Sequence, residues 1–169
     1  GYVWDLETAA LIGPIEGHKA EVSKVRWNAV HGAWVTASED STLRMWNPDG
    51  SPLMKSEALK AQGRAGGGSD GEPSLMKLET EGFSAMAIQE ESGAVIVGLS
   101  DSSVVLLDLA REVVLQVYRG HKDLVRSIAC IPEKNQLITA AWDHSIRVWM
   151  AMPHAKRHSN AVHRSVSRG

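Results

Sequence analysis

The sequence of 169 residues has a single cysteine, no long apolar run and no large excess of charge. The lone Cys130 excludes a framework of internal disulfides and fits a reducing compartment. We therefore expect a cytoplasmic location, with the nucleus as the alternative. No window approaches the roughly 18 apolar residues of a membrane span, and no signal peptide is visible. The net charge of −2 does not by itself favour nucleic acid or another polyanion as a partner.

The most informative feature that is present is an internal repeat. Residues 17–46 and 120–149 are identical at nine of thirty positions without a gap. The shared residues include a Gly-His pair, an Asp in a polar turn and a Trp that ends an alternating apolar run. In both copies the His precedes the Asp by 22 residues and the Trp by 28. Self-similarity at a fixed spacing indicates a repeat architecture.

Each repeat has the pattern of a small antiparallel sheet. Residues 33–37 and 136–140 are short runs of β-prone residues, and residues 113–118 read as a further strand. Residues 43–46 and 146–149 alternate, which places Leu43, Met45 and their equivalents on one face of a strand and the arginines on the other. The turns between these runs contain Asp, whose side chain can bond its own backbone. The sequence therefore predicts an all-β fold.

The Gly-His pairs, the turn Asp and the terminal Trp together resemble the WD-repeat β-propeller family. Units of this family run about 40–45 residues, with a Gly-His near one end and a Trp-Asp at the other. The terminal dipeptides here are Trp4-Asp5, Trp46-Asn47 and Trp149-Met150, so only the first is a literal Trp-Asp. The resemblance covers most of residues 1–150.

The resemblance implies a β-propeller segment of about three four-stranded blades, plus the last strands of a preceding blade. The repeats fall at about 6–47, 48–108 and 109–150. The middle repeat is degenerate and contains a glycine-rich insertion at 60–73, and residues 151–169 form a basic tail that we expect to be disordered. Because propellers close with about 4–8 blades, we expect the remaining blades to lie outside this chain.

Four positions of each complete repeat look at first like a hydrolytic triad with an added Trp. A catalytic site has no reason to occur twice at identical spacing, whereas a scaffold element does. In WD-repeat proteins these positions form a buried hydrogen-bond chain, so the resemblance implies a structural role. The residues are His18, Thr36, Asp40 and Trp46 in the first repeat, and His121, Thr139, Asp143 and Trp149 in the third.

Another set of positions has a functional reading that also comes from the resemblance. In WD-repeat propellers, the residues three and five after the His, and the residue before the turn Asp, point onto a face that binds partners. These are Glu21, Ser23 and Glu39 in the first repeat, and Leu124, Arg126 and Trp142 in the third. The degenerate repeat has Gly82, Ser84 and Ser100 there. Leu, Arg and Trp together have the composition of an interaction hot spot.

The remaining motifs do not indicate catalysis or a cofactor. The glycine run lacks a following Gly-Lys-Ser/Thr, so it is no phosphate loop. His154, His158 and His163 have no Cys or carboxylate to complete a metal site. Cys130 lies on an apolar strand and is predicted to be a small buried side chain.

We therefore expect a non-enzymatic scaffold that binds other proteins or peptides. One alternative is an accessory, substrate-positioning propeller of a multidomain enzyme such as a phosphoinositide phosphatase. Another is polyanion binding through the basic tail, although nucleic acid is a weak expectation because the tail lacks interleaved aromatic residues.

Overall fold

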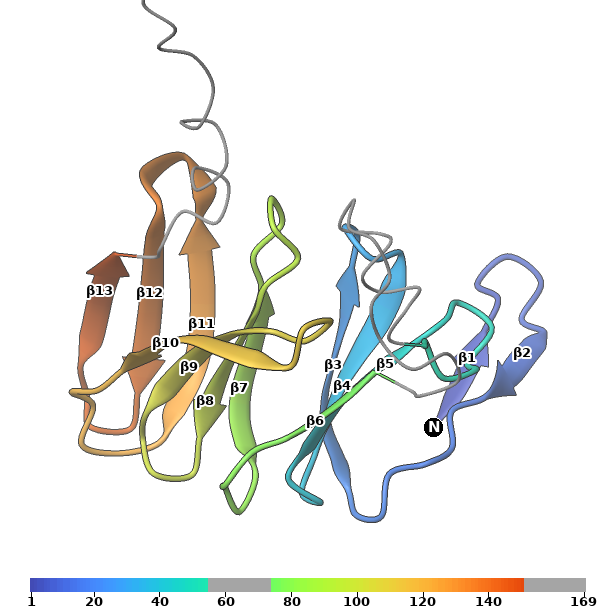
Figure 1. Ribbon diagram of the computed structural model, residues 1–169, viewed down its shortest axis with the longest axis horizontal. Helices are drawn as coiled ribbons and strands as arrows, with labels where there is room; N and C mark the ends of the chain where they lie inside the picture. The colour runs from blue at the N-terminus through green and yellow to red at the C-terminus, as the bar shows by residue number, and fades with distance from the viewer. Residues whose placement is uncertain (55–73, 151–169) are drawn as a thin grey trace, which may run out of the picture.

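In the described part of the chain, short alternating runs separated by Asp- and Gly-containing turns fold into thirteen strands and one short 3-10 helix. The computed structural model describes residues 1–54 and 74–150. The glycine-rich insertion predicted at 60–73 therefore falls almost wholly outside the described residues, and the basic tail at 151–169 wholly so. The described strands form four antiparallel sheets that stand side by side (Figure 1). The predicted all-β propeller segment is confirmed.

The sheets follow one another along the chain. The first is a two-stranded ribbon of β1 (Tyr2–Trp4) and β2 (Leu11–Pro14). Blade 1 contains β3 (Val22–Asn28), β4 (Ala33–Ser38), β5 (Thr42–Trp46) and β6 (Leu75–Lys77). Blade 2 contains β7 (Phe83–Ile88), β8 (Val95–Leu99), β9 (Val104–Asp108) and β10 (Val113–Tyr118). Blade 3 contains β11 (Val125–Ile131), the 3-10 helix η1 (Pro132–Lys134), β12 (Gln136–Ala141) and β13 (Ile146–Met150).

Blades 1 and 2 have the predicted four strands, whereas blade 3 has three among the described residues. The reason lies in the chain path. The outermost strands, β6 and β10, come from residues that follow the Trp46 position and its equivalent, Leu107. In blade 3 the residues that follow Met150 lie outside the described part of the chain.

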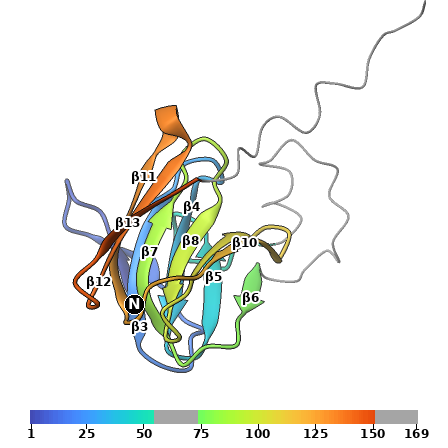
Figure 2. The same ribbon diagram turned by 90° about the vertical axis from the view of Figure 1, so that its left-hand side faces the viewer.

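The blades pack face to face through apolar side chains. The inner strand of blade 2, β7, contacts the inner strands β3 and β11 on its two sides. Val35, Leu43 and Met45 of blade 1 pack against Val97 and Leu107 of blade 2, and all five are at most 1% exposed. A second apolar cluster joins the opposite face of blade 2 to blade 3. Figure 2, viewed from the side of blade 3, shows the sheets lying behind one another.

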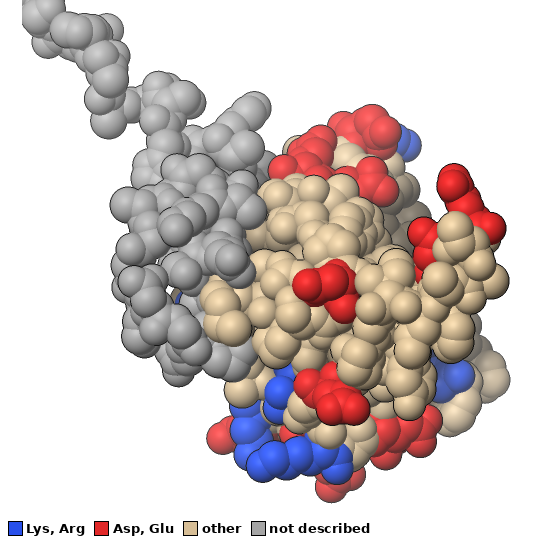
Figure 3. Space-filling view, turned by 90° about the vertical axis from the view of Figure 1, so that its right-hand side faces the viewer, with Lys and Arg blue, Asp and Glu red and all other residues tan. Residues whose placement is uncertain are grey.

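The outward face of blade 3 is open. Leu43 and Met45 of blade 1 are covered by blade 2, but their equivalents Ile146 and Val148 are 73% and 58% exposed. The opposite side of the molecule also exposes apolar residues, among them Trp4 on β1 and Trp27 on β3. Figure 3 looks onto that side, where most of the described surface is uncharged and charged side chains are scattered over it, with more of them toward its edges. Both ends of the row of blades therefore present apolar surface.

Candidate functional site

Each inner strand has a β-bulge near its first residue. The pairing register shifts between Val22 and Lys24, between Phe83 and Ala85, and between Val125 and Ser127. The residues at the bulges are Ser23, Ser84 and Arg126, which are the predicted partner-facing positions five residues after the His position. A bulge re-aims a side chain and is common beside functional sites. The bulges and the neighbouring turns form one surface, which we call the turn face; it comprises residues 18–23, 39–41, 79–84, 100–102, 121–126 and 142–144, at the lower edge of Figure 1.

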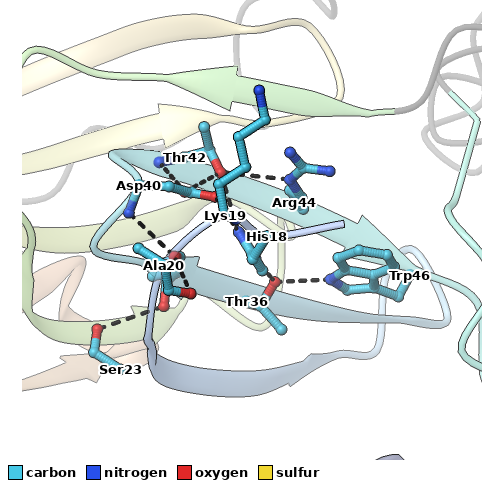
Figure 4. A network of polar contacts seen from close by, with 11 residues as sticks. His18, Lys19, Ala20, Ser23, Thr36, Asp40, Thr42, Arg44 and Trp46 are labelled. Carbon is cyan, nitrogen blue, oxygen red and sulfur yellow. Dashed lines mark hydrogen bonds and ion pairs between the residues drawn. The ribbon is translucent and has the colours of Figure 1, made fainter. Parts of the chain in front are cut away.

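Behind the turn face of blade 1 lies a chain of four hydrogen-bonded side chains (Figure 4). The indole Nε1–H of Trp46 donates to Thr36 Oγ1 at 2.7 Å, and the same oxygen is 2.7 Å from His18 Nε2. His18 Nδ1 lies 3.0 Å from Asp40 Oδ2. These contacts are all satisfied when a neutral His18 carries its proton on Nδ1 and accepts the hydroxyl proton of Thr36 on Nε2.

Blade 3 repeats the arrangement at the equivalent atoms. Trp149 Nε1 and His121 Nε2 lie 2.8 and 2.7 Å from Thr139 Oγ1, and His121 Nδ1 lies 2.9 Å from Asp143 Oδ2. The side chains of His121 and Asp143 are only 1% and 7% exposed. The backbone N–H of Lys122 also donates to Asp143, which ties the loop that precedes β11 to the turn between β12 and β13. The geometry suits a buried scaffold, since no substrate can reach the hydroxyl.

The electrostatics of blade 1 favour the same protonation states. Burial lowers the pKa of His18 and outweighs the opposing effect of Asp40. Burial alone would raise the pKa of Asp40, but hydrogen bonds from Thr42, the Lys19 backbone and His18 hold it well below the usual range. Hydrogen bonds from Ser145 and the Lys122 backbone likewise hold the pKa of Asp143 low. The network is thus built around neutral imidazole and ionised carboxylate.

Steric crowding explains why a glycine precedes the histidine in each Gly-His pair. Gly120 has φ +156°, and a Cβ there would lie 3.1 Å from Arg147 Nη1 and 3.2 Å from the Trp149 ring. Gly17 has φ +145° and the same two neighbours in blade 1. A side chain at either position would strain the backbone and displace the Arg that covers the network.

Blade 2 holds the equivalent loop by other means. Val97 and Leu107 replace Thr36 and Trp46, and both are buried without polar contacts to satisfy. The loop before β7 is held instead by Thr80, whose hydroxyl donates to Gly82 O at 2.7 Å and lies 3.0 Å from Ser100 Oγ. Apolar packing and a short hydroxyl bridge therefore replace the His-Asp link.

The turn face of blade 3 presents the predicted Leu-Arg-Trp set together. Trp142 is 55% exposed, and the Arg126 guanidinium carbon lies 4.9 Å from the centroid of its ring. The backbone N–H of Trp142 donates to Leu124 O at 3.0 Å. Trp142 therefore stacks on a residue of its own blade and keeps most of its surface in solvent.

The turn face of blade 1 is acidic. Glu21 and Glu39 are exposed, and the backbone N–H of Glu39 donates to Glu21 O at 2.9 Å. The Glu39 side chain lies beside Gly82 of blade 2, 3.9 Å from where a Cβ would stand. Ser23 is half-buried, and its hydroxyl donates to Phe83 O of blade 2 at 3.2 Å. Its hydroxyl thus links two blades, and a role in binding stays a prediction.

Other candidate sites contribute little in the described residues. Cys130 is half-buried rather than buried, because it faces a water-sized gap between blades 2 and 3, and burial raises its thiol pKa. Within residues 1–54 and 74–150, no group of three His, Cys, Asp or Glu side chains is placed to hold a metal ion. The same ranges contain no helix that is long and apolar enough to cross a membrane. His154, His158 and His163 lie outside the described residues.

Comparison with known proteins matches the geometry. The family model for the WD domain, G-beta repeat, matches residues 10–47 and 112–150. Each matched segment begins at the outermost strand of one sheet and ends with the third strand of the next, β2 to β5 and β10 to β13. Among solved structures, the computationally designed Ika4 protein has a TM-score of 0.64 and 20% identity, over 89% of this chain and 79% of that one.

The relatives found by sequence are longer proteins. Human WD repeat-containing protein 36 is 26% identical over 81% of this chain, and the Culex quinquefasciatus ribosome biogenesis protein WDR12 homolog is 26% identical over 80%. The Caenorhabditis elegans pre-mRNA-processing factor 19 is 30% identical over 51%. The chain spans 13%, 34% and 17% of the lengths of these three relatives. Members of the WD-repeat β-propeller family are in general protein-interaction scaffolds rather than enzymes. The chain belongs to this family, as shown by its two matched repeats, by relatives that align over most of its length and by its row of propeller-like sheets.

Proposed function

We propose that this chain is a non-catalytic scaffold that binds a partner protein or peptide on its turn face. The observation that carries the proposal is the exposed ring of Trp142, against which Arg126 lies. Arg126 stacks on this ring, a backbone hydrogen bond to Leu124 fixes its turn, and the adjacent Asp143 is anchored in the buried network. A large aromatic side chain held rigid in solvent loses little conformational entropy when a partner covers it.

The blades supply rigidity and the turns supply recognition, as is usual where loops are mounted on a packed scaffold. The repeated His-Asp-Thr set of the described blades is buried, which supports a structural role for it rather than a catalytic one. The open face of blade 3 supports a second part of the proposal. Its residues Ile146 and Val148 match the blade 1 residues that blade 2 covers, so a further blade is the expected neighbour there.

The test uses a displayed library of random peptides of about twelve residues, selected on the immobilised 169-residue chain. We expect Trp142→Ala to lower the affinity of the chain for the selected peptides by about thirtyfold or more, which is the loss typical of a central aromatic anchor. Trp4→Ala is the matched control, because Trp4 is 56% exposed but lies on β1, away from the turn face. If every selected peptide bound Trp142→Ala as it binds the wild type, the turn face of blade 3 would not be the site.

A further inference from the structure

Arg126 differs from the other bulge residues in where its side chain points. The hydroxyl of Ser23 donates into blade 2, and Ser84 Oγ is buried. Arg126 instead is exposed and lies over the Trp142 ring. Among the described residues, no carboxylate forms an ion pair with Arg126. Blade 3 is therefore the described blade whose bulge places a charge on the turn face.

The guanidinium of Arg126 is available to bind an oxyanion. It lies over the Trp142 ring, and among the described residues its N–H groups have no hydrogen-bond acceptor, so its N–H edge can donate to an added ligand. A carboxylate fits that edge with two parallel hydrogen bonds. The exposed part of Trp142, beside Leu124, accepts a large apolar side chain next to such a carboxylate. Lys122 and Asp123 flank the site with opposite charges.

The other end of the turn face has the opposite preference. Glu21 and Glu39 of blade 1 are exposed, and Glu81 of blade 2 is exposed beside Gly82, which Glu39 approaches. These carboxylates repel an acidic group and attract Lys or Arg. Blade 2 presents Gly82 and Ser100 together with the exposed carboxylates Glu79, Glu81 and Asp101, of which Asp101 pairs with Arg119. The turn face is therefore acidic at blades 1 and 2 and has its accessible guanidinium at blade 3.

The spacing of the blades sets the length of chain that joins the two ends. Packed sheets are separated by about 10 Å, so blades 1 and 3 are about 20 Å apart. An extended chain advances about 3.3 Å per residue and covers that distance in about six residues.

We propose that the turn face binds an extended peptide segment of fixed polarity. A carboxylate adjacent to a large apolar residue lies on Arg126 and Trp142, and a Lys or Arg about six residues away lies over Glu21 and Glu39. This inference rests on the proposed function, since it assumes that the turn face is the binding site. It adds the charge pattern of the partner and the direction in which the partner crosses the blades.

The test is the charge pattern of the selected peptides and its coupling to Arg126. We expect the peptides to share an Asp or Glu next to an aromatic or large aliphatic residue, with a basic residue about six positions away. Arg126→Gln should lower the affinity for a selected peptide about tenfold. It should have no effect on affinity once the Asp or Glu of the peptide is replaced by Asn or Gln. Arg111→Gln is the matched control, because Arg111 is an exposed arginine in the turn between β9 and β10.

The outcomes separate the two proposals. If the selected peptides need Trp142 but lack the acidic residue, or bind Arg126→Gln with unchanged affinity, the turn face is the binding site and the charge pattern is wrong. If the selected peptides bind the Trp142→Ala and Arg126→Gln variants with unchanged affinity, the proposed function itself fails. Glu39→Lys tests the other end: it should reverse the preference for the basic residue, and an unchanged preference would overturn the polarity.

Discussion

At the residue scale, the buried Trp-Thr-His-Asp hydrogen-bond networks hold the turns of blades 1 and 3 in place. In blade 1 the ring of His18 accepts from Thr36 on one nitrogen and donates to Asp40 from the other. A second proton would remove the acceptor that Thr36 needs. The fold therefore disfavours protonated His18, in agreement with the direction of its pKa. Because His18 holds the turn that carries Glu39, the protonation of this buried histidine bears on the surface that we propose for binding.

The stability of the chain should consequently fall in acid. Because the folded-state pKa of His18 is lowered, its contribution is complete above the ordinary His pKa of about 6.5 and is lost as the pH falls below it. The pKa of Asp40 is also lowered, so its contribution is present above the ordinary Asp value of about 3.9 and is lost below that. We expect the thermal midpoint, followed by circular dichroism, to fall first between about pH 7 and 5, and again below about pH 4.

The assignment to His18 is checked by substitution. His18→Asn should reduce the fall between about pH 7 and 5, whereas His144→Asn, at an exposed turn position, should leave it unchanged. A wild-type midpoint that stays level across this range would show that the fold accepts the protonated ring.

At the element scale, two ways of building the same blade stand next to each other. Blades 1 and 3 hold their turns with the His-Asp network, and blade 2 replaces the network with Val97 and Leu107. A buried polar group stabilises a fold only when its partners are present, and an apolar set of similar shape serves as well. Each blade therefore uses either a complete polar network or a wholly apolar set. A blade that combined a polar residue of one set with apolar residues of the other should be less stable.

A reciprocal pair of substitutions tests this interpretation. Thr139→Val leaves His121 Nε2 and Trp149 Nε1 without the oxygen that joins them, and Val97→Thr buries a hydroxyl in an apolar site. We expect each to lower the free energy of unfolding by about 1–3 kcal/mol, measured by urea denaturation. Both changes are nearly isosteric, so packing alone predicts little effect. If Val97→Thr were neutral, blade 2 would contain a polar partner that its contacts do not include.

At the scale of the whole molecule, the row of blades is apolar at both ends. The outward face of blade 3 has apolar residues typical of a protein interior, but these residues are exposed to solvent. Ile146 is 73% exposed, whereas its equivalent in blade 1, Leu43, is 0% exposed. Exposed apolar patches of this kind mark interaction surfaces or cause association. A further blade would cover the face in the same way as blade 2 covers blade 1.

The contrast between Leu43 and Ile146 makes a direct test. Leu43→Lys buries an unpaired charge between blades and should destabilise the chain by several kcal/mol. Ile146→Lys, at the same register position, should leave the unfolding midpoint nearly unchanged and reduce self-association, measured by light scattering. If Ile146→Lys unfolded the chain as Leu43→Lys does, the outward face of blade 3 would be covered in solution.

Much of this arrangement follows from the sequence alone. The alternation of residues 43–46 places Leu43 and Arg44 on opposite faces because side chains alternate along a strand. The repeated spacing from His to Asp brings His121 to Asp143, because the same turns recur in each repeat. The strands β4, β5, β10, β12 and β13 lie where the pattern predicts them. These are local properties, and a single repeat is enough to specify them.

Only the tertiary structure decided the properties that depend on a neighbouring blade. Leu43 and Ile146 have the same pattern and opposite burial, since burial depends on whether another sheet lies against the face. Ser23 and Arg126 share a bulge position, but one hydroxyl reaches the next blade and one guanidinium stacks on Trp142. Sequence periodicity fixes the direction of a side chain relative to its own strand, whereas contacts between sheets depend on packing that no single strand encodes.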